Sequence, residues 1–294
     1  MWSRTAQELA PGVFADTSFR RVNVGAIQTD AGFVLIDTPP FPDDARRWRE
    51  MLAGVSDKPI LAIVNTDCHP DRILGNCWFD ARGIVAHDDT VARLQNLPST
   101  FLDSTIDSIT TNALERSRFS GAHLRLPTIG FTQRMQLRYG GRSVPLLAMP
   151  GPMAGSIWVH LPDERVLFSG DSVIADQHPY ISSPCTKSWL DNLTLLRRAR
   201  FAADQIVPGR GPLAQKSATE PISNYLRLAR RRVYSLFRAG RPRADTSTLV
   251  PELLALFPYP EADAEQAQRR IKAGLDRIYE EFKSTDKTDE MPEV

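Results

Sequence analysis

The sequence contains few cysteines, almost no net charge and no long apolar run. Of its 294 residues only Cys68, Cys77 and Cys185 are cysteine, and no two of them are spaced as C-x-x-C. An odd number without that spacing excludes a disulfide scaffold or a structural zinc finger and suits a reducing compartment. The 36 Lys and Arg against 35 Asp and Glu argue against nucleic-acid binding through a global positive field. Apolar runs such as residues 60–64 are far too short to span a bilayer.

The N-terminal residues and the charge balance set the expected location and partners. Residues 1–11 include Arg4 and Glu8 and lack the hydrophobic region of a secretory signal. We therefore expect a cytoplasmic protein whose partner is a small-molecule ligand, with neither nucleic acid nor a membrane involved. A homodimer is left open.

Short strands occur in two groups, each accompanied by helices, and further helices follow. Apolar and alternating patterns predict a first group of strands at 22–29, 32–37, 60–64 and 84–86, and a second at 135–139, 143–148, 156–160, 165–169 and 205–207. Helical periodicity predicts helices at 43–52, 90–118 with a break near Pro98, 190–200, 222–238, 248–257 and 264–282. This grouping favours an α/β sandwich over an alternating doubly wound sheet. We place 1–219 in that domain, 220–284 in a C-terminal helical extension and 285–294 in a disordered tail.

Segment 64–76, which reads VNTDCHPDRILGN, is the most informative part of the chain for metal-binding or catalytic chemistry. It begins at the end of an apolar strand, where α/β proteins commonly place ligand sites. Asp67, His69 and Asp71 occupy alternate positions, so an extended loop could direct all three side chains the same way. Two carboxylates and an imidazole are plausible metal ligands. The alternative is that Asp71 or Thr66 caps the following helix and His69 is a surface histidine.

Five segments together resemble the metallo-β-lactamase superfamily. They are GFVLIDT at 32–38, NTDCHPDRILGN at 65–76, MPGPMAGS at 149–156, LFSGD at 167–171 and VPGRG at 207–211. They look like the family's early strand ending in Asp, its HxHxDH loop, its PGHTxGS segment, its strand with the bridging aspartate and its PGHG turn. The resemblance covers roughly the first 210 residues. It implies the αββα four-layer sandwich of the metallo-β-lactamase fold and, usually, hydrolysis by a metal-activated water.

Four histidines of the family pattern are replaced in this chain. The replacing residues are Asp67, Arg72, Pro152 and Arg210, whereas the matching His69, Asp71 and Asp171 are retained. The resemblance implies that one metal position keeps Asp67, His69 and Asp171 as a candidate single site. The other position loses two ligands to arginine, which has no lone pair to donate.

The two arginines bring the same positive charge as one divalent ion. We hypothesise that Arg72 and Arg210 pair with Asp71 and Asp171, so that salt bridges replace a lost metal, because unpaired buried carboxylates are costly. The alternative is that both arginines are surface residues. The expected cofactor is none, or one divalent ion. Manganese, iron or magnesium is then favoured over zinc, because the surviving ligands are rich in carboxylate.

Two functions are compatible with these residues. The loss of four histidines favours a pseudoenzyme that keeps the pocket for a small ligand. The retained ligands favour a mononuclear hydrolase of an ester, thioester or lactone, with Asp71 as the candidate catalytic residue. Pro152, His178 and Cys68 are candidate pocket residues. The alternatives are a loop-holding role for His178 and plain packing for Cys68.

Arginines also gather near the start of the C-terminal extension. They are Arg227, Arg230, Arg231, Arg232, Arg238, Arg241 and Arg243. Apolar residues interleave with them at helical spacing, which predicts an amphipathic helix with a solvated basic face. An acidic partner or nucleic acid bound by this cluster is the alternative.

Overall fold

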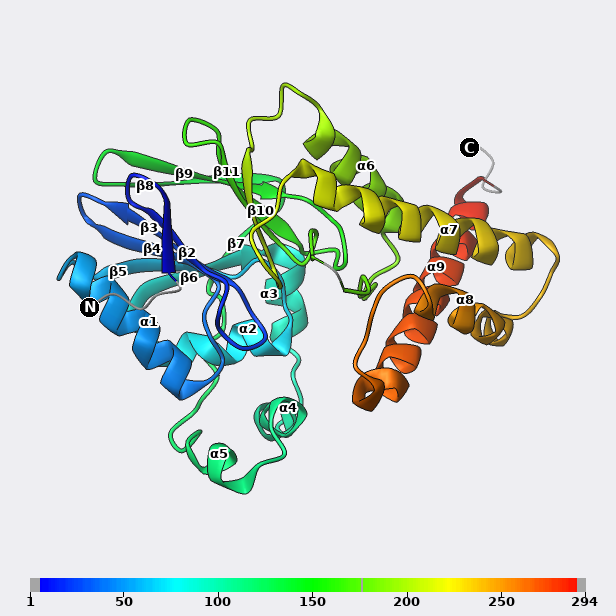
Figure 1. Cartoon of the computed structure of the whole chain (residues 1–294), viewed down its shortest axis with the longest axis horizontal. Coiled ribbons are helices and arrows are strands. Elements are labelled where there is room, and N and C mark those ends of the chain that lie inside the picture. The colour runs from blue at the N-terminus through cyan, green and yellow to red at the C-terminus, as the bar shows by residue number, and fades with distance from the viewer. Residues whose placement is uncertain (1–5, 176, 290–294) are drawn as a thin grey trace.

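The computed structural model describes residues 6–175 and 177–289, which form two β-sheets packed face to face between layers of helices (Figure 1). The larger sheet consists, in spatial order, of β1 (Ala6–Ala10), β2 (Val13–Asp16), β3 (Val24–Thr29), β4 (Gly32–Ile36), β5 (Ile60–Val64), β6 (Ala81–His87) and β7 (Ile129–Phe131). The smaller sheet consists of β12 (Gln205–Pro208), β11 (Val166–Gly170), β10 (Ile157–Leu161), β9 (Arg142–Ala148) and β8 (Arg134–Tyr139). This layering confirms the predicted αββα sandwich.

Helices cover both outer faces and continue past the smaller sheet at the right of Figure 1. They are α1 (Pro42–Val55), α2 (Pro70–Leu74), α3 (Asp88–Leu94), α4 (Phe101–Ile109), α5 (Ala113–Ser117), α6 (Thr186–Arg197), α7 (Thr219–Arg238), α8 (Val250–Leu254) and α9 (Ala264–Asp289). Single 3₁₀ segments lie at Gly75–Trp78, Lys216–Ala218, Arg243–Leu249 and Glu261–Asp263. The predicted helix at 90–118 is divided into α3, α4 and α5.

Local sequence accounts for the elements that support the site. Strand β5 is the apolar run ILAIV, as expected for a parallel strand covered on both faces. Helix α1 begins with Pro42 at its first turn, followed by two acidic residues, which suits a helix N-terminus. Its Ala45, Trp48 and Leu52 are buried against the larger sheet.

Three apolar cores hold the layers together. The core between the sheets includes Val34 and Val64 from the larger sheet and Val159 and Phe168 from the smaller. A second core lies between the larger sheet and α1. The third joins the smaller sheet to α6, α7, α8 and α9, and it includes Trp189, Leu226 and Leu275 among its members. The C-terminal helices are therefore packed onto the sandwich.

Because several strands run parallel, their carboxyl ends lie at one edge of the molecule. Strands β4, β5 and β6 are parallel neighbours, and β11 is parallel to β12. Backbone hydrogen bonds join the two sheets there: the Ile157 N–H donates to the Thr66 carbonyl at 2.9 Å, and the Asn23 N–H donates to the Gly209 carbonyl at 3.0 Å. The loops that follow β4, β5, β11 and β12 meet at this edge.

The chain differs from the sequence-based expectation in a few elements. Strands β1, β2 and β7 were not predicted, and the helix expected at 248–257 contains α-helix only over Val250–Leu254. Helix α9 continues to Asp289, so residues 285–289 are helical and not a disordered tail. Extending an existing helix adds a hydrogen bond for each residue fixed, which makes this continuation inexpensive. The rest of the expected tail, 290–294, lies outside the described residues.

Among the described residues, no helix combines the length and the apolar content that a membrane-spanning segment requires.

Candidate functional site

The loop that follows β5 is fixed by the residue that follows β4. Asp37 has a positive φ of 54° and is buried, and its carboxylate accepts hydrogen bonds from Thr66. The Thr66 N–H donates to Asp37 Oδ1 at 2.9 Å, and the Thr66 hydroxyl donates to Oδ2 at 2.6 Å. The loop then runs through Asp67 to His69, which stands at the N-cap position of α2. The ends of two adjacent parallel strands are thus tied together.

Arg72, on α2, lies at the centre of the site and has no exposed surface. Its Nε donates to Asp37 Oδ2 and to Thr66 Oγ1, each at 3.0 Å. Its Nη2 donates to Asp171 Oδ1 at 2.7 Å, across the gap between the sheets. Its Nη1 is buried and has no hydrogen-bond partner in the described chain. One guanidinium therefore joins the loops after β4, β5 and β11.

Arg210 follows β12 and makes the second set of ion pairs. Its Nη2 donates to Asp71 Oδ2 at 3.0 Å, and its Nε lies 3.4 Å from Asp171 Oδ2. Its Nη1 also hydrogen-bonds to the carbonyl of Arg21. Both oxygens of Asp171 therefore face an arginine, Oδ1 facing Arg72 and Oδ2 facing Arg210.

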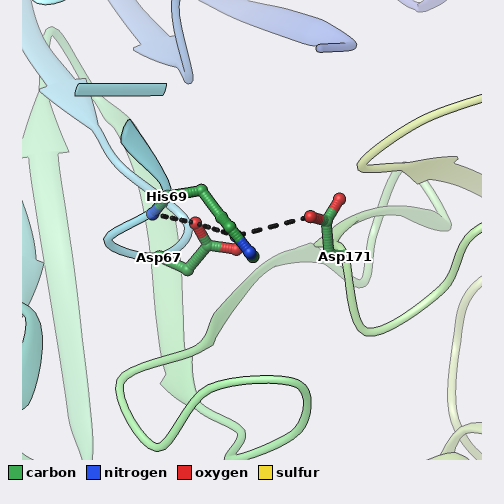
Figure 2. Close-up of side chains that lie close together, drawn as sticks. All are labelled: Asp67, His69 and Asp171. Carbon is green, nitrogen blue, oxygen red and sulfur yellow. Dashed lines mark hydrogen bonds and ion pairs between the residues drawn. The ribbon is translucent and has the colours of Figure 1, made fainter. Parts of the chain in front are cut away.

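Asp67, His69 and Asp171 lie close together beside these arginines, with His69 between the two carboxylates (Figure 2). The His69 Nδ1 is 3.0 Å from Asp67 Oδ1 and 3.4 Å from Asp171 Oδ2. The His69 backbone N–H donates to Asp67 Oδ1 at 2.9 Å. Neither Nδ1 of His69 nor Oδ1 of Asp71 makes a hydrogen bond with the described residues, although both atoms are buried.

The close contacts of these groups shift their protonation. Burial raises the pKa of Asp37 to about 6, although Arg72 opposes that shift. Burial would also raise the pKa of Asp67 and Asp71, but neighbouring cations outweigh it and lower both values: chiefly Arg72 for Asp67 and Arg210 for Asp71. Burial opposes charge on His69, but the nearby carboxylates, Asp67 above all, raise its pKa. The arginines therefore favour the ionised forms of Asp67 and Asp71, and these carboxylates in turn favour the protonated form of His69.

Glycines allow the arginine and aspartate chains to pack this closely. A Cβ on Gly209 would lie 2.0 Å from Asp171 Oδ1 and 2.4 Å from Arg72 Nη2. Gly170 has a φ of 52°, and a Cβ there would lie 2.7 Å from Thr66 Oγ1. Gly209 therefore excludes any larger side chain while the Arg72–Asp171 pair is present, and Gly170 excludes one while Thr66 stays in place.

A cleft of about 550 Å³ opens onto the site. His69, Asp71, Asp171 and Arg210 line it, together with residues of α3, α4 and α9. This volume is within the range of roughly 300–1,000 Å³ that is usual for small-molecule sites.

The profile of the family described as the metallo-beta-lactamase superfamily matches residues 17–212, which is most of the chain. The chain belongs to the metallo-β-lactamase superfamily. The match includes the loops after β4, β5, β11 and β12 that form the ion-pair network, but not α9, which also lines the cleft. The resemblance expected from the sequence is thereby confirmed.

Several relatives of this superfamily member are informative. A linear primary-alkylsulfatase of Pseudomonas sp. is 27% identical over 237 residues, covering 69% of this chain and 44% of the relative. An acyl-coenzyme A thioesterase of Homo sapiens is 30% identical over 138 residues, covering 45% of this chain and 49% of the relative. This chain therefore spans about half the length of these curated relatives. A solved metallo-beta-lactamase family protein of Thermus thermophilus shares the fold, with a TM-score of 0.66, 18% identity and 95% of both chains covered.

Metallo-β-lactamase superfamily members typically bind metal ions, and the donor atoms decide which ions this site fits. A guanidinium has no lone pair, so Arg72 and Arg210 cannot act as ligands and a two-ion centre does not fit. For one ion, Asp67, His69 and Asp171 form a candidate site, since their ligand atoms lie within 4.8 Å of one another. However, Arg72 lies 2.7 Å from an Asp171 oxygen and 3.7 Å from an Asp67 oxygen. Its fixed positive charge disfavours a further cation there.

The remaining pocket candidates lie at the edge of the site or outside it. Cys68 lines the cleft, but its thiol contacts the sulfur of Met153 at 3.2 Å and burial raises its pKa to about 11. A thiol in that state is a poor nucleophile. His178 also lines the cleft, and its Nε2 lies 3.0 Å from the Leu254 carbonyl. Pro152 is buried behind the lining residues, and its carbonyl accepts the N–H groups of Ser182 and Ser183.

Two polar residues of the network were not among the sequence-based candidates. Asp37 and Thr66 hydrogen-bond to the guanidinium of Arg72, as described above. Asp37 directly follows an apolar strand, near the start of a loop, as Asp67 does. This position could have identified Asp37 as a site residue from the sequence. Two side-chain amides join the two ends of the loop after β5. The Asn65 amide donates to the Asn76 oxygen at 3.1 Å, and the Asn76 amide donates to the Asn65 oxygen at 2.9 Å.

Proposed function

We propose that this chain binds a small organic ligand in its cleft without a metal ion, as a pseudoenzyme of the superfamily. The observation that carries this proposal is the ion pair of 2.7 Å between Arg72 Nη2 and Asp171 Oδ1. The guanidinium has no exposed surface, so it is a fixed part of the fold. It supplies the positive charge that the surrounding carboxylates need.

The second arginine supports the same proposal. Arg210 pairs with Asp71 at 3.0 Å and lies 3.4 Å from the second oxygen of Asp171. The negative charges of Asp71 and Asp171, which would face a second ion, are thus already balanced by arginine. Breaking such a buried ion pair costs several kcal/mol of stability, about 3–5 kcal/mol in other proteins. We therefore expect the arginines to stay in place when metal is added.

The test is the metal content and the chelator response of the full chain, purified without chelator. We expect less than about 0.1 equivalent of zinc, manganese or iron per chain by mass spectrometry. We also expect EDTA to leave the thermal midpoint unchanged, because a metal that bound only the folded state would add to stability. A stoichiometric ion whose removal lowers the midpoint contradicts the proposal.

One observation favours a second candidate, a mononuclear hydrolase of an ester, thioester or lactone. The donor atoms of Asp67, His69 and Asp171 cluster within 4.8 Å, and His69 Nδ1 has no hydrogen-bond partner among the described residues. The two relatives are named as an alkylsulfatase and a thioesterase, which supports ester-type chemistry. A divalent ion held by these residues would supply Lewis acidity. Asp71, whose Oδ1 lacks a partner in the described chain and whose pKa is lowered, is then the ionised base.

Turnover assays separate the two candidates. We expect no hydrolysis of nitrophenyl esters, acyl thioesters or alkyl sulfates above the buffer rate, with or without manganese, magnesium or iron. Metal-dependent turnover that disappears in Asp67→Asn, but persists in the exposed control Asp57→Asn, would establish the hydrolase instead.

A further inference from the structure

The cleft contains more positive charge than the buried network requires. Its arginines, among the described residues, are Arg21, Arg93, Arg210, Arg270 and Arg277. The carboxylates that line it are Asp71 and Asp171, and each already pairs with Arg72 or Arg210. Arg93, Arg270 and Arg277 make no ion pair with any described residue. The cleft therefore presents uncompensated cations to whatever enters it.

Two of these arginines come from one face of helix α9. Arg270, Ala273 and Arg277 line the cleft, and their spacing of three and seven residues places them on one side of a helix. The neighbouring Gly274 lets α9 approach closely, since a Cβ there would lie 3.1 Å from Ile181 Cβ. The C-terminal helix is thus a wall of the cleft.

Tyr180 connects this wall to the buried network. The guanidinium of Arg270 lies 5.5 Å from the centre of the Tyr180 ring, and that ring lies 5.8 Å from the ring of His69. Burial, together with the positive charges of Arg210 and Arg270, lowers the pKa of Arg21. Like charges are therefore gathered within electrostatic reach of one another, which is unfavourable unless an anion joins them.

The rest of the cleft has an apolar lining. Leu94 and Leu97 come from α3 and the residues after it, and Phe101 and Ile109 from α4. Met153 adds to the same lining. A polar group is also available, because Ser182 Oγ is buried without a hydrogen-bond partner in the described chain. The cleft thus offers cations from α9 and an apolar surface from α3 and α4.

We propose that the cleft binds an amphipathic anion, with its charged head on Arg270 and Arg277 of α9 and its aliphatic chain against α3 and α4. This inference rests on the proposed function, because it assigns a ligand class to the same metal-free cleft. Guanidinium groups bind carboxylate, sulfate and sulfonate heads through paired hydrogen bonds. The aliphatic chain gains from leaving water.

Calorimetric titration of the full, chelator-treated chain with decanoate tests the proposal. We expect one site per chain, at least about tenfold weaker binding of decyltrimethylammonium, and weak binding of inorganic sulfate, which lacks the chain. Decanesulfonate in place of decanoate distinguishes a carboxylate preference from a general anion preference.

Two double variants test which arginines bind the charged head of the ligand. Arg270→Gln/Arg277→Gln should weaken decanoate binding at least about tenfold. Arg231→Gln/Arg269→Gln removes the same charge from exposed positions outside the cleft and should change the affinity less than about twofold. Thermal unfolding of both double variants checks that each is folded.

Each outcome bears on a separate claim. Equal binding of decanoate and decyltrimethylammonium, equal weakening by both double variants, or no binding by the folded metal-free chain overturns the anion inference and leaves the metal-independent proposal standing. Decanoate binding that appears only after a stoichiometric metal ion is restored overturns the proposed function itself.

Discussion

Arg72 has no exposed surface, and its guanidinium hydrogen-bonds to side chains from the loops after β4, β5 and β11. At residue scale, the site depends on how this one cation balances buried carboxylates. Asp37 and Asp171 bind it directly, and Asp67 lies 3.7 Å away. Folding removes each of these carboxylates from water, so each needs a positively charged partner to offset its lost hydration.

Arg72→Met should lower the free energy of unfolding by about 3–5 kcal/mol, because it leaves several buried carboxylates without their counter-ion. Arg72→Lys keeps the charge but loses the two-armed hydrogen bonding, so an intermediate loss is expected. Urea unfolding monitored by circular dichroism measures both.

The control is Arg165→Met, which removes an exposed arginine from its ion pair with Asp204 and should leave the urea midpoint unchanged. A loss in Arg72→Met no larger than that of this control would show that the guanidinium does not balance the buried acids.

At the level of elements, the apolar pattern was sufficient for most strands of the core, although β2, whose Val13 and Ala15 lie in that core, was not predicted. The run 60–64 was predicted as a strand and is β5, and the strands predicted at 22–29 and 32–37 are the paired β3 and β4. Strand β1 was missed because Gln7 and Glu8 interrupt its apolar pattern at the edge of the sheet. Strand β7 has only three residues, too few for a period to be seen.

In the candidate site, residues from one short segment could be predicted, whereas residues brought together by tertiary packing could not. Asp67, His69 and Asp71 were predicted from one short segment, because consecutive residues share a loop. Arg270 and Arg277 were not predicted, since they reach the cleft only through the packing of α9, and no sequence pattern reports that packing. The arginines that the sequence does group together include Arg230 and Arg232, and these are paired with Glu281 and Glu252.

Glu281 adds polar contacts to the apolar packing that holds helix α9 in place. Its carboxylate accepts the N–H groups of Thr186 and Lys187 at the N-terminus of α6, each at 2.9 Å, and pairs with Arg230 of α7 at 2.7 Å. A carboxylate at a helix N-terminus is favourable, and here it joins three helices.

Glu281→Ala should therefore lower the free energy of unfolding by about 2–3 kcal/mol, through the loss of charge-assisted hydrogen bonds. The adjacent Glu280→Ala removes only a partly exposed pair with Arg243 and should cost about 0–1 kcal/mol. Thermal and urea unfolding of the two variants measure the difference, and equal losses would exclude a special role for Glu281.

For the whole molecule, the shifted groups of the site predict how stability depends on pH. His69 has a raised pKa, so its contribution is complete below its ordinary value of 6.5 and is lost as pH rises through the folded value. The pKa of Asp37, raised to about 6, also favours the folded state as pH falls through that value. Asp67 and Asp71 have lowered pKa values, so their contribution is lost below about 3.8.

The free energy of unfolding should thus be greatest near about pH 4. It should fall at lower pH as Asp67 and Asp71 become protonated, and at higher pH, first as Asp37 ionises up to about pH 6 and then as His69 loses its proton above its ordinary pKa value. Urea unfolding across pH 3–9 measures this profile. In His69→Gln the decline on the alkaline side should become shallower. A wild-type profile that keeps rising above pH 8 contradicts the shifts assigned to His69 and Asp37.

The central claim is that guanidinium groups take the part of metal ions in this cleft. Its most direct measurement is anomalous diffraction at the zinc edge from crystals soaked in zinc. We expect no zinc peak at Asp67, His69, Asp71 or Asp171, with Arg72 still paired with Asp171 and Arg210 still paired with Asp71. Two zinc peaks a few ångströms apart among these residues, with both arginines displaced, would contradict it.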